Sequence, residues 1–230
     1  MRICILGASG DIGEETSKAL RGGGHEIIEC YRNQRGVAGR TEQERNEAAY
    51  ISTETLKDLE TSMEKVFMNG RVECIVNALG IGKSTFSPKS IPISTDALTI
   101  REWEEVIYVN LKIPILLTEI AIKNGVKRVV HIGSALTAHG LYGTAMAQAY
   151  SASKKGLFEY CQKKNREIGP EATVACIAPG LVKTKMTEGS GLRALFKGEL
   201  EPGGVAQWVL RVVEQESIAN SVQLPIREMK

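Results

Sequence analysis

Several features that mark specialised proteins are absent from this sequence or scarce in it. Neither sign of charge dominates, because the formal net charge is only +2, so nothing favours nucleic acid or an anionic membrane as a partner. The longest largely apolar stretch, residues 113–122, contains Thr118 and Glu119 and is too short for a bilayer, which needs ~20 apolar residues. The first apolar run is also too short for a secretory leader, and we therefore expect a cytoplasmic protein.

Cysteine is sparse as well, with five residues, and none of them has the spacing of zinc ligands. Four lie in apolar, strand-like runs: Cys4, Cys30, Cys74 and Cys176. We expect small buried thiols in a reducing compartment. The sequence therefore predicts neither a disulfide framework nor a metal site.

Strand-like and helix-like segments alternate along the chain. The alternation predicts an α/β fold, with a single domain over residues 1–230 built on a doubly wound parallel sheet of about seven strands flanked by helices. Apolar, β-rich runs occur at 2–6, 26–31, 49–52, 72–76, 127–132, 173–177 and 221–226. Segments with helical spacing occur at 14–20, 53–68, 100–123, 150–168 and 205–213.

A glycine-rich turn follows the first strand and reads Gly7-Ala8-Ser9-Gly10-Asp11-Ile12-Gly13. Its place between a strand and a helix suits the pyrophosphate of a dinucleotide, which binds backbone N–H groups at a helix N-terminus. The alternative is a glycine-rich turn that holds no ligand.

The end of the second strand bears on which dinucleotide binds. An NAD site needs a carboxylate there for the ribose 2′-OH, but Arg32 follows the strand and Glu29 comes too early in it. Arg32 can pair with the 2′-phosphate of NADP, with Arg35 and the Ser9 hydroxyl nearby. NADP(H) is therefore expected in preference to NAD(H), unless the two arginines belong to a solvated loop.

Tyr150 and Lys154 lie four residues apart and share one face of the predicted helix. A phenol beside an ammonium is a tunable acid, and the cation is expected to lower the pKa of the tyrosine. Ser134 supplies a hydroxyl just after the fifth strand. Asn110 lies four residues before Pro114, where a helix kinks and frees a carbonyl, so its side chain either faces the site or is a satisfied core amide.

Polar or glycine-containing stretches follow most of the predicted strands. Because ligands bind at the carboxyl ends of strands near the topological switch point, these stretches are expected to meet at one edge of the sheet. Farther along, residues 185–204 are polar and rich in glycine, which predicts a flexible segment; Arg193 and Lys197 there either meet an anionic substrate or are solvated. The stretches that meet are 7–13, Arg32, 77–80, Ser134 and 179–184.

In this order, the stretches resemble the short-chain dehydrogenase/reductase family over essentially the whole chain, as a classical-sized member with a Rossmann fold. The resemblance implies hydride transfer between NADP(H) and a small-molecule carbonyl or secondary alcohol. The resembling motifs are Gly7-Ala8-Ser9-Gly10-Asp11-Ile12-Gly13, Asn77-Ala78-Leu79-Gly80, Asn110, Ser134, Tyr150-Ser151-Ala152-Ser153-Lys154 and Pro179-Gly180-Leu181-Val182-Lys183-Thr184.

The family implies a role for each catalytic candidate. Tyr150 would be the general acid and base, Lys154 would lower its pKa and hold the nicotinamide ribose, Ser134 would bind the substrate carbonyl, and Asn110 would position a water in a proton relay. A loop at about 185–204 would contact the substrate, and the chain would form a dimer or tetramer of identical subunits. Cofactor contacts are implied for Gly7, Ser9, Gly10, Asp11, Ile12, Gly13, Arg32, Asn77, Ala78, Gly80, Tyr150, Lys154, Pro179, Gly180, Val182 and Thr184.

The chain also departs from the family pattern. Asp11 stands where members usually carry their middle glycine, and the final strand lacks the usual glycine-rich ending, which speaks against a tetramer. The interval between Ser134 and Tyr150 is long, so His139 and Tyr142 either line the pocket or lie on the surface. These departures leave a second hypothesis open, a catalytically silent NADP-binding sensor or scaffold protein with the same fold.

Overall fold

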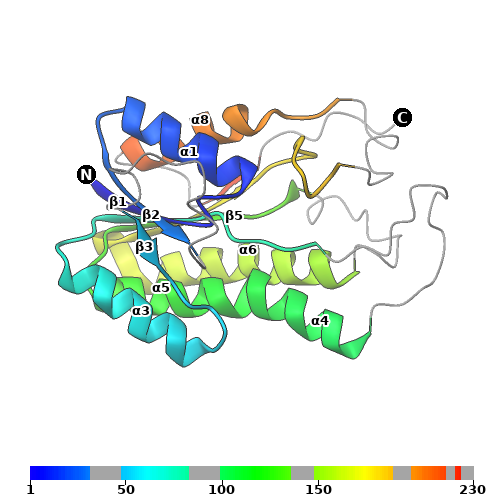
Figure 1. Cartoon of the computed structure of the whole chain (residues 1–230), viewed down its shortest axis with the longest axis horizontal. Helices are drawn as coiled ribbons and strands as arrows, with labels where there is room; N and C mark the ends of the chain where they lie inside the picture. The colour runs from blue at the N-terminus through cyan, green and yellow to red at the C-terminus, as the bar shows by residue number, and fades with distance from the viewer. Residues whose placement is uncertain (32–47, 83–98, 136–147, 189–197, 216–220, 224–230) are drawn as a thin grey trace.

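A computed structural model describes residues 1–31, 48–82, 99–135, 148–188, 198–215 and 221–223. In this part of the chain, seven strands form one sheet in the order β3-β2-β1-β4-β5-β6-β7, and every pairing is parallel (Figure 1). The predicted doubly wound parallel sheet is confirmed. The strands are β1 (Arg2–Leu6), β2 (Glu26–Tyr31), β3 (Ala49–Tyr50), β4 (Cys74–Asn77), β5 (Arg128–Ile132), β6 (Thr173–Ala178) and β7 (Ser221–Gln223).

The strand order places the topological switch point at the centre of the sheet. The chain builds outward in one direction from β1 to β3 and then returns, so that β4 pairs with the free side of β1. Connections leave β1 and β4 toward opposite faces at their carboxyl ends, which is where ligands bind in such sheets.

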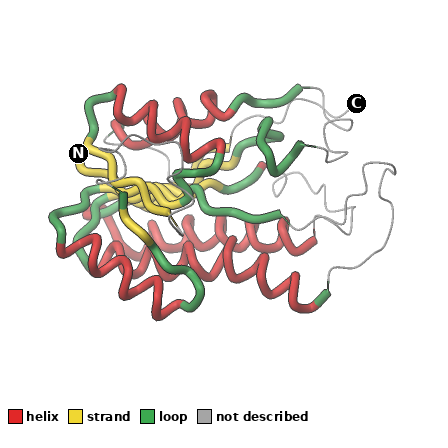
Figure 2. Tube along the Cα trace, viewed as in Figure 1, coloured by secondary structure: helices red, strands yellow, loops and turns green. Residues whose placement is uncertain are grey.

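Helices cover both faces of the sheet, in three layers (Figures 1 and 2). One face carries α1 (Asp11–Gly22) and α8 (Pro202–Glu214), which pack against each other. The other face carries α3 (Leu56–Met68), α5 (Ile113–Lys123) and α6 (Gln148–Ile168). Helix α4 (Ile100–Ile107) runs into α5 through one turn of π-helix, Tyr108–Lys112, and a short 3-10 turn, Gly169–Glu171, follows α6.

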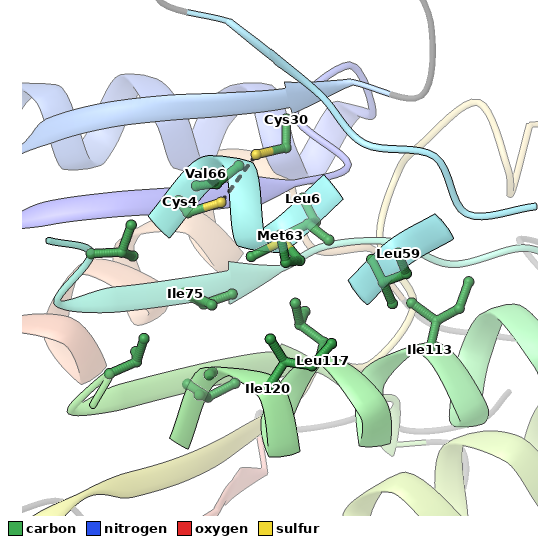
Figure 3. Packing of buried hydrophobic residues seen from close by; sticks show 14 of the residues in the cluster. Cys4, Leu6, Cys30, Leu59, Met63, Val66, Ile75, Ile113, Leu117 and Ile120 are labelled. Atoms are coloured by element: carbon green, nitrogen blue, oxygen red, sulfur yellow. Dashed lines mark hydrogen bonds between the residues drawn. The ribbon is translucent and has the colours of Figure 1, made fainter. Parts of the chain in front are cut away.

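The hydrophobic core forms one layer on each side of the sheet, and alternate residues of β1 serve the two layers. Ile3 and Ile5 face α1 and α8, whereas Cys4 and Leu6 face α3 and α5. Burial on both faces explains why this strand is apolar without a break. Figure 3 shows the second layer, in which Leu6 and Ile75 of the sheet meet Met63 of α3 together with Leu117 and Ile120 of α5.

All five cysteines are buried free thiols, as expected for the four that lie in strands. Cys4 and Cys30 lie on neighbouring strands with their sulfur atoms 3.0 Å apart (Figure 3). No group of three or more potential metal ligands is formed within the described ranges. Nor does any described helix have the length and apolarity that crossing a membrane requires.

The predicted kink at Pro114 takes the form of a wider helical turn. Pro114 has no N–H to return to Asn110, and the Ile113 N–H bonds instead to the carbonyl of Tyr108, five residues back. The other helices and strands match their predicted positions to within a few residues at each end.

Candidate active site

The glycine turn joins β1 to α1 at the carboxyl edge of the sheet and leaves no room for a side chain at two of its glycines. Gly7 has a φ of +80°, and a Cβ there would lie 2.9 Å from the carbonyl carbon of Ala78. A Cβ on Gly13 would lie 2.1 Å from the Gly7 carbonyl oxygen. Gly10 is the N-cap of α1, and because it has no side chain, the first N–H groups of the helix receive no side-chain hydrogen bond from it. The turn therefore offers what a dinucleotide pyrophosphate requires, closely approachable backbone N–H groups at a helix N-terminus.

A buried chain of hydrogen bonds supports the turn after β4. Asn77 Oδ1 accepts from the Leu79 N–H at 3.2 Å, so its Nδ2 donates to His131 Nδ1 at 3.1 Å. His131 Nε2 must then carry the ring proton, and it donates to Thr118 Oγ1 at 2.8 Å. The Thr118 hydroxyl in turn donates to the Pro114 carbonyl at 2.9 Å. Burial, aided by the charge of Lys154, lowers the pKa of His131 to about 3, so the ring is neutral.

Tyr150 and Lys154 lie in the first two turns of α6, beside the end of β5. Lys154 is 3% exposed, and its Nζ donates to the carbonyl oxygen of Ile132 at 2.8 Å. The same Nζ lies 5.8 Å from the centroid of the Tyr150 ring. Ser134 is buried and its side chain hydrogen-bonds to Tyr150. A phenol, a hydroxyl and an ammonium therefore meet where β5 ends.

Burial governs the protonation of the phenol and the ammonium. It raises the pKa of Tyr150 to about 12, although the hydrogen bond with Ser134 acts in the opposite direction. It also lowers the pKa of Lys154 to about 8. Removal from water is the largest cause of the shift in the pKa of Tyr150 and makes it upward, and the contribution of Lys154, whose Nζ lies 5.8 Å from the centroid of the ring, stays a prediction. At neutral pH, Tyr150 is a protonated phenol.

Asn110 lies within the π-helical turn and is fully buried. Its Oδ1 accepts from the Ile81 N–H at 2.9 Å, and its Nδ2 donates to the Ile81 carbonyl at 2.9 Å and to Ser153 Oγ at 3.3 Å. Ser153 donates to the carbonyl of Tyr150 at 2.7 Å. The amide is thus fully hydrogen-bonded and ties the turn after β4 to the helical turn that carries Tyr150, while its role in a proton relay stays a prediction.

Gly80 is the point at which these groups converge. A Cβ on Gly80 would lie 3.5 Å from Lys154 Nζ and 3.7 Å from Asn110 Oδ1. The turn after β4 therefore passes directly beside the ammonium, with only a glycine between backbone and charge.

The segment after β6 completes the edge. The Pro179 carbonyl accepts from the Ala135 N–H at 2.7 Å, next to Ser134. Val182 is buried and forms a parallel bridge with Leu200. The Thr184 N–H donates to Thr187 Oγ1 at 3.0 Å, and Gly180 lies between Pro179 and the bridge.

Most of the predicted site residues thus lie together at the carboxyl edge of the sheet. Arg32 and Arg35 lie outside the described residues, as do His139, Tyr142, Arg193, Lys197 and part of the loop at 185–204. The residues gathered at the edge are Gly7, Ser9, Gly10, Asp11, Ile12, Gly13, Asn77, Ala78, Gly80, Asn110, Ser134, Tyr150, Lys154, Pro179, Gly180, Val182 and Thr184.

The Glu29 carboxylate is bound by other side chains of the protein and not by a ribose. It is 1% exposed on the face of β2 that α1 covers, where Arg21 Nη1 donates to it at 2.8 Å and the Tyr31 hydroxyl also donates. Burial acts to raise the pKa of Glu29, but these two hydrogen bonds outweigh it and the pKa is lowered. The prediction that Glu29 comes too early in the strand to bind a cofactor agrees with this position.

The sequence did not predict the chain of hydrogen bonds from Asn77 through His131 to Thr118. A histidine inside an apolar strand and a threonine inside an apolar helix were the available signals. Neither residue reveals its partner, because the three side chains come from three different elements and meet only in the folded sheet.

Comparison with known proteins identifies the family. The sequence profile described as short chain dehydrogenase matches residues 1–193, and the chain therefore belongs to the short-chain dehydrogenase family. As a member, it is an oxidoreductase that acts on CH–OH or C=O groups. It is 30% identical over 238 residues to carbonyl reductase family member 4 of Danio rerio. This alignment covers 96% of this chain and 94% of that protein.

One solved structure supports the same assignment, and a second shares the fold. A short chain dehydrogenase from Burkholderia cenocepacia J2315, in complex with NADP, superposes with a TM-score of 0.80 at 25% identity, covering 98% of this chain and 96% of the other. A 3-ketoacyl-(acyl-carrier-protein) reductase from Brucella melitensis, complexed with NADH, superposes with a TM-score of 0.81, covering 97% and 96%. At 18% identity, the second likeness shows the fold alone.

Proposed function

We propose that this protein is an NADP(H)-dependent oxidoreductase that interconverts a carbonyl and a secondary alcohol, with Tyr150 as the general acid and base. The observation that carries the proposal is the meeting of Tyr150, Ser134 and Lys154 at the end of β5, within the edge that the glycine turn also borders. The resemblance to carbonyl reductase family member 4 over nearly the full length supports the same reaction class.

The dinucleotide fits the residues present. The glycine turn would hold its pyrophosphate, because it leads into the N-terminus of α1 and its N-cap, Gly10, has no side chain to cover the first N–H groups of the helix. When bound, the cofactor supplies or accepts the hydride. The expected preference for NADP(H) depends on Arg32, since Tyr31 ends β2 where an NAD site needs an acid, and Glu29 is engaged by Arg21 and Tyr31. The NADP complex of the Burkholderia relative supports this choice.

Protonation favours Tyr150 as a proton donor in carbonyl reduction. With a pKa of about 12 the phenol keeps its proton at neutral pH and can give it to a developing alkoxide. Ser134 has a single O–H donor, which bonds the phenol in this structure and would turn to the same substrate oxygen when the carbonyl binds. Lys154, with a pKa of about 8, can return a proton to the tyrosine at ordinary pH. Asn110 acts through Ser153 and holds the backbone of Tyr150 in position.

The test is Tyr150→Phe, assayed with NADPH against a panel of aldehydes and ketones. We expect turnover to fall by about 10²–10⁴-fold, the usual contribution of a general acid, while NADPH binding is retained. Tyr160→Phe is the matched control, because Tyr160 lies on the same helix and its hydroxyl donates to Glu119 on the surface at 2.7 Å. Turnover that survives in Tyr150→Phe would sink the assignment.

The silent sensor or scaffold remains the competing function, and the same panel separates the two. NADPH binding without turnover on any carbonyl would favour it. A homo-oligomeric state and a cytoplasmic location stay predictions, the first testable by light scattering on the purified protein.

A further inference from the structure

Asp11, which stands where family members usually carry a glycine, makes a contact across the carboxyl edge of the sheet. Asp11, in the first turn of α1, accepts a hydrogen bond through Oδ2 from the backbone N–H of Lys185 at 2.7 Å. Its other oxygen lies 3.9 Å from Lys185 Nζ, and the Asp11 side chain is 28% exposed. A carboxylate that stands in place of a glycine thus joins two segments that are 174 residues apart.

The partner segment is a compact turn, Thr184–Glu188, held from its own side. Thr187 and Glu188 donate their N–H groups to the Thr184 carbonyl at 3.0 and 2.9 Å. Thr187 Oγ1 donates to the Val182 carbonyl at 2.7 Å. The turn is therefore hydrogen-bonded within itself and to Val182, in the segment that follows β6.

The same turn also reaches the opposite side of the switch point. A Cβ built on Gly82, after β4, would lie 3.5 Å from the sulfur of Met186. The turn thus contacts α1 through Lys185 and the β4 loop through Met186, and it spans the edge at which the glycine turn and Gly80 lie.

We infer that Asp11 is a positioning residue that clasps the turn 184–188 to the N-terminus of α1 and so slows release of the dinucleotide. The inference rests on the proposed function. A second negative charge beside a pyrophosphate is unfavourable, so Asp11 is suited to bind the turn rather than the phosphates, with the Lys185 ammonium reducing the repulsion.

Two variants break the clasp from opposite sides. Asp11→Ala removes the acceptor, and Lys185→Pro removes the donor N–H while leaving the carboxylate in place. Proline is tolerated at this site because Lys185 is the first residue of a helical turn. Asp11→Asn removes the charge but keeps an oxygen that can accept, and Lys185→Ala removes only the distant ammonium.

Dissociation of NADPH is measured by stopped-flow displacement with NADP, followed by nucleotide fluorescence. We expect about fivefold faster release in Asp11→Ala and in Lys185→Pro, since a partly exposed hydrogen bond to a charge is lost. The double variant should match either single one, because both remove the same bond. Asp11→Asn keeps an acceptor and removes a charge beside the pyrophosphate, so it should release NADPH no faster than the original protein, and Lys185→Ala should stay within about twofold of the original rate.

Amide hydrogen exchange of the ligand-free protein provides a readout without cofactor. Exchange across 185–188 should rise in Asp11→Ala and not in Lys185→Ala, with circular dichroism confirming that each variant is folded. Unchanged exchange, an unchanged release rate, or fully additive effects in the double variant would each overturn the clasp. Failure of the unmodified protein to bind NADPH would instead overturn the proposed function and the retention role with it, while the exchange data would still report the contact.

Discussion

Two buried threonines provide a matched pair for measuring the hydrogen-bond chain behind the site. Thr118 on α5 and Thr16 on α1 are both 0% exposed. The Thr118 hydroxyl contacts His131 Nε2 and the Pro114 carbonyl, whereas Thr16 Oγ1 has no hydrogen-bond partner in the described structure. Threonine and valine have similar volumes, so Thr→Val at each position changes the polar group and little else.

The two substitutions are expected to change the free energy of unfolding in opposite directions or by different amounts. Thr118→Val leaves the His131 N–H buried without an acceptor, which costs about 1–3 kcal/mol, and we expect the free energy of unfolding to fall by about 2 kcal/mol. For a chain of this length, that corresponds to a melting temperature lower by about 4–8 °C. Thr16→Val removes a hydroxyl that is desolvated without compensation, so stability should be unchanged or higher by up to about 1 kcal/mol.

Urea unfolding, followed by circular dichroism, gives both values, and thermal melting checks them. Equal m-values are required, so that the comparison concerns the native state and not a change in the unfolded chain. The assignment of donors along Asn77, His131 and Thr118 is refuted if Thr118→Val is as stable as Thr16→Val.

Two further predictions follow from buried positions. His131 has a pKa of about 3 when folded and about 6.5 when unfolded, so the unfolded chain binds more protons between these values and stability falls as pH drops below about 6.5, by up to about 1.4 kcal/mol per pH unit. When the free energy of unfolding is measured in urea from pH 8 to 5, its slope against pH should be smaller in His131→Asn by the equivalent of about one bound proton. A slope that does not change would contradict the neutral ring. Gly13→Ala forces a Cβ to 2.1 Å from the Gly7 oxygen and should abolish NADPH binding in titrations, whereas Gly22→Ala in the same helix, with no atom within 4 Å of its Cβ, should bind normally; equal binding by both would contradict the close packing.

The sheet and the location of the site could be predicted because they depend on local signals. Period-2 and period-3.6 patterns locate the elements, and parallel strands carry whatever follows them to one edge. Tyr150 and Lys154 could be paired from spacing alone, since four residues make one helical turn. The glycine turn was recognisable because a strand precedes it and a helix follows it.

Properties that depend on tertiary environment could not be predicted. The pKa of Tyr150 depends on how deeply the phenol is buried, and burial is the largest cause of its upward shift. The partners of the Asn110 side chain, Ile81 and Ser153, lie on other segments and become visible only in the folded protein. Asp11 was visible as a departure from the family, but its partner, Lys185, lies at the far end of the chain.

The packing of α8 on α1 has a consequence for how the protein is made. Helix α1 carries the glycine turn and leaves the ribosome well before α8, because it lies far ahead of α8 in the chain (Figure 1). Leu20 of α1 and Val209 of α8 belong to the same core layer, so the side of α1 that faces α8 stays uncovered until α8 arrives. A nascent chain therefore contains the glycine turn long before the helix that follows this turn is stabilised, and we expect binding competence to appear only after α8 has been made.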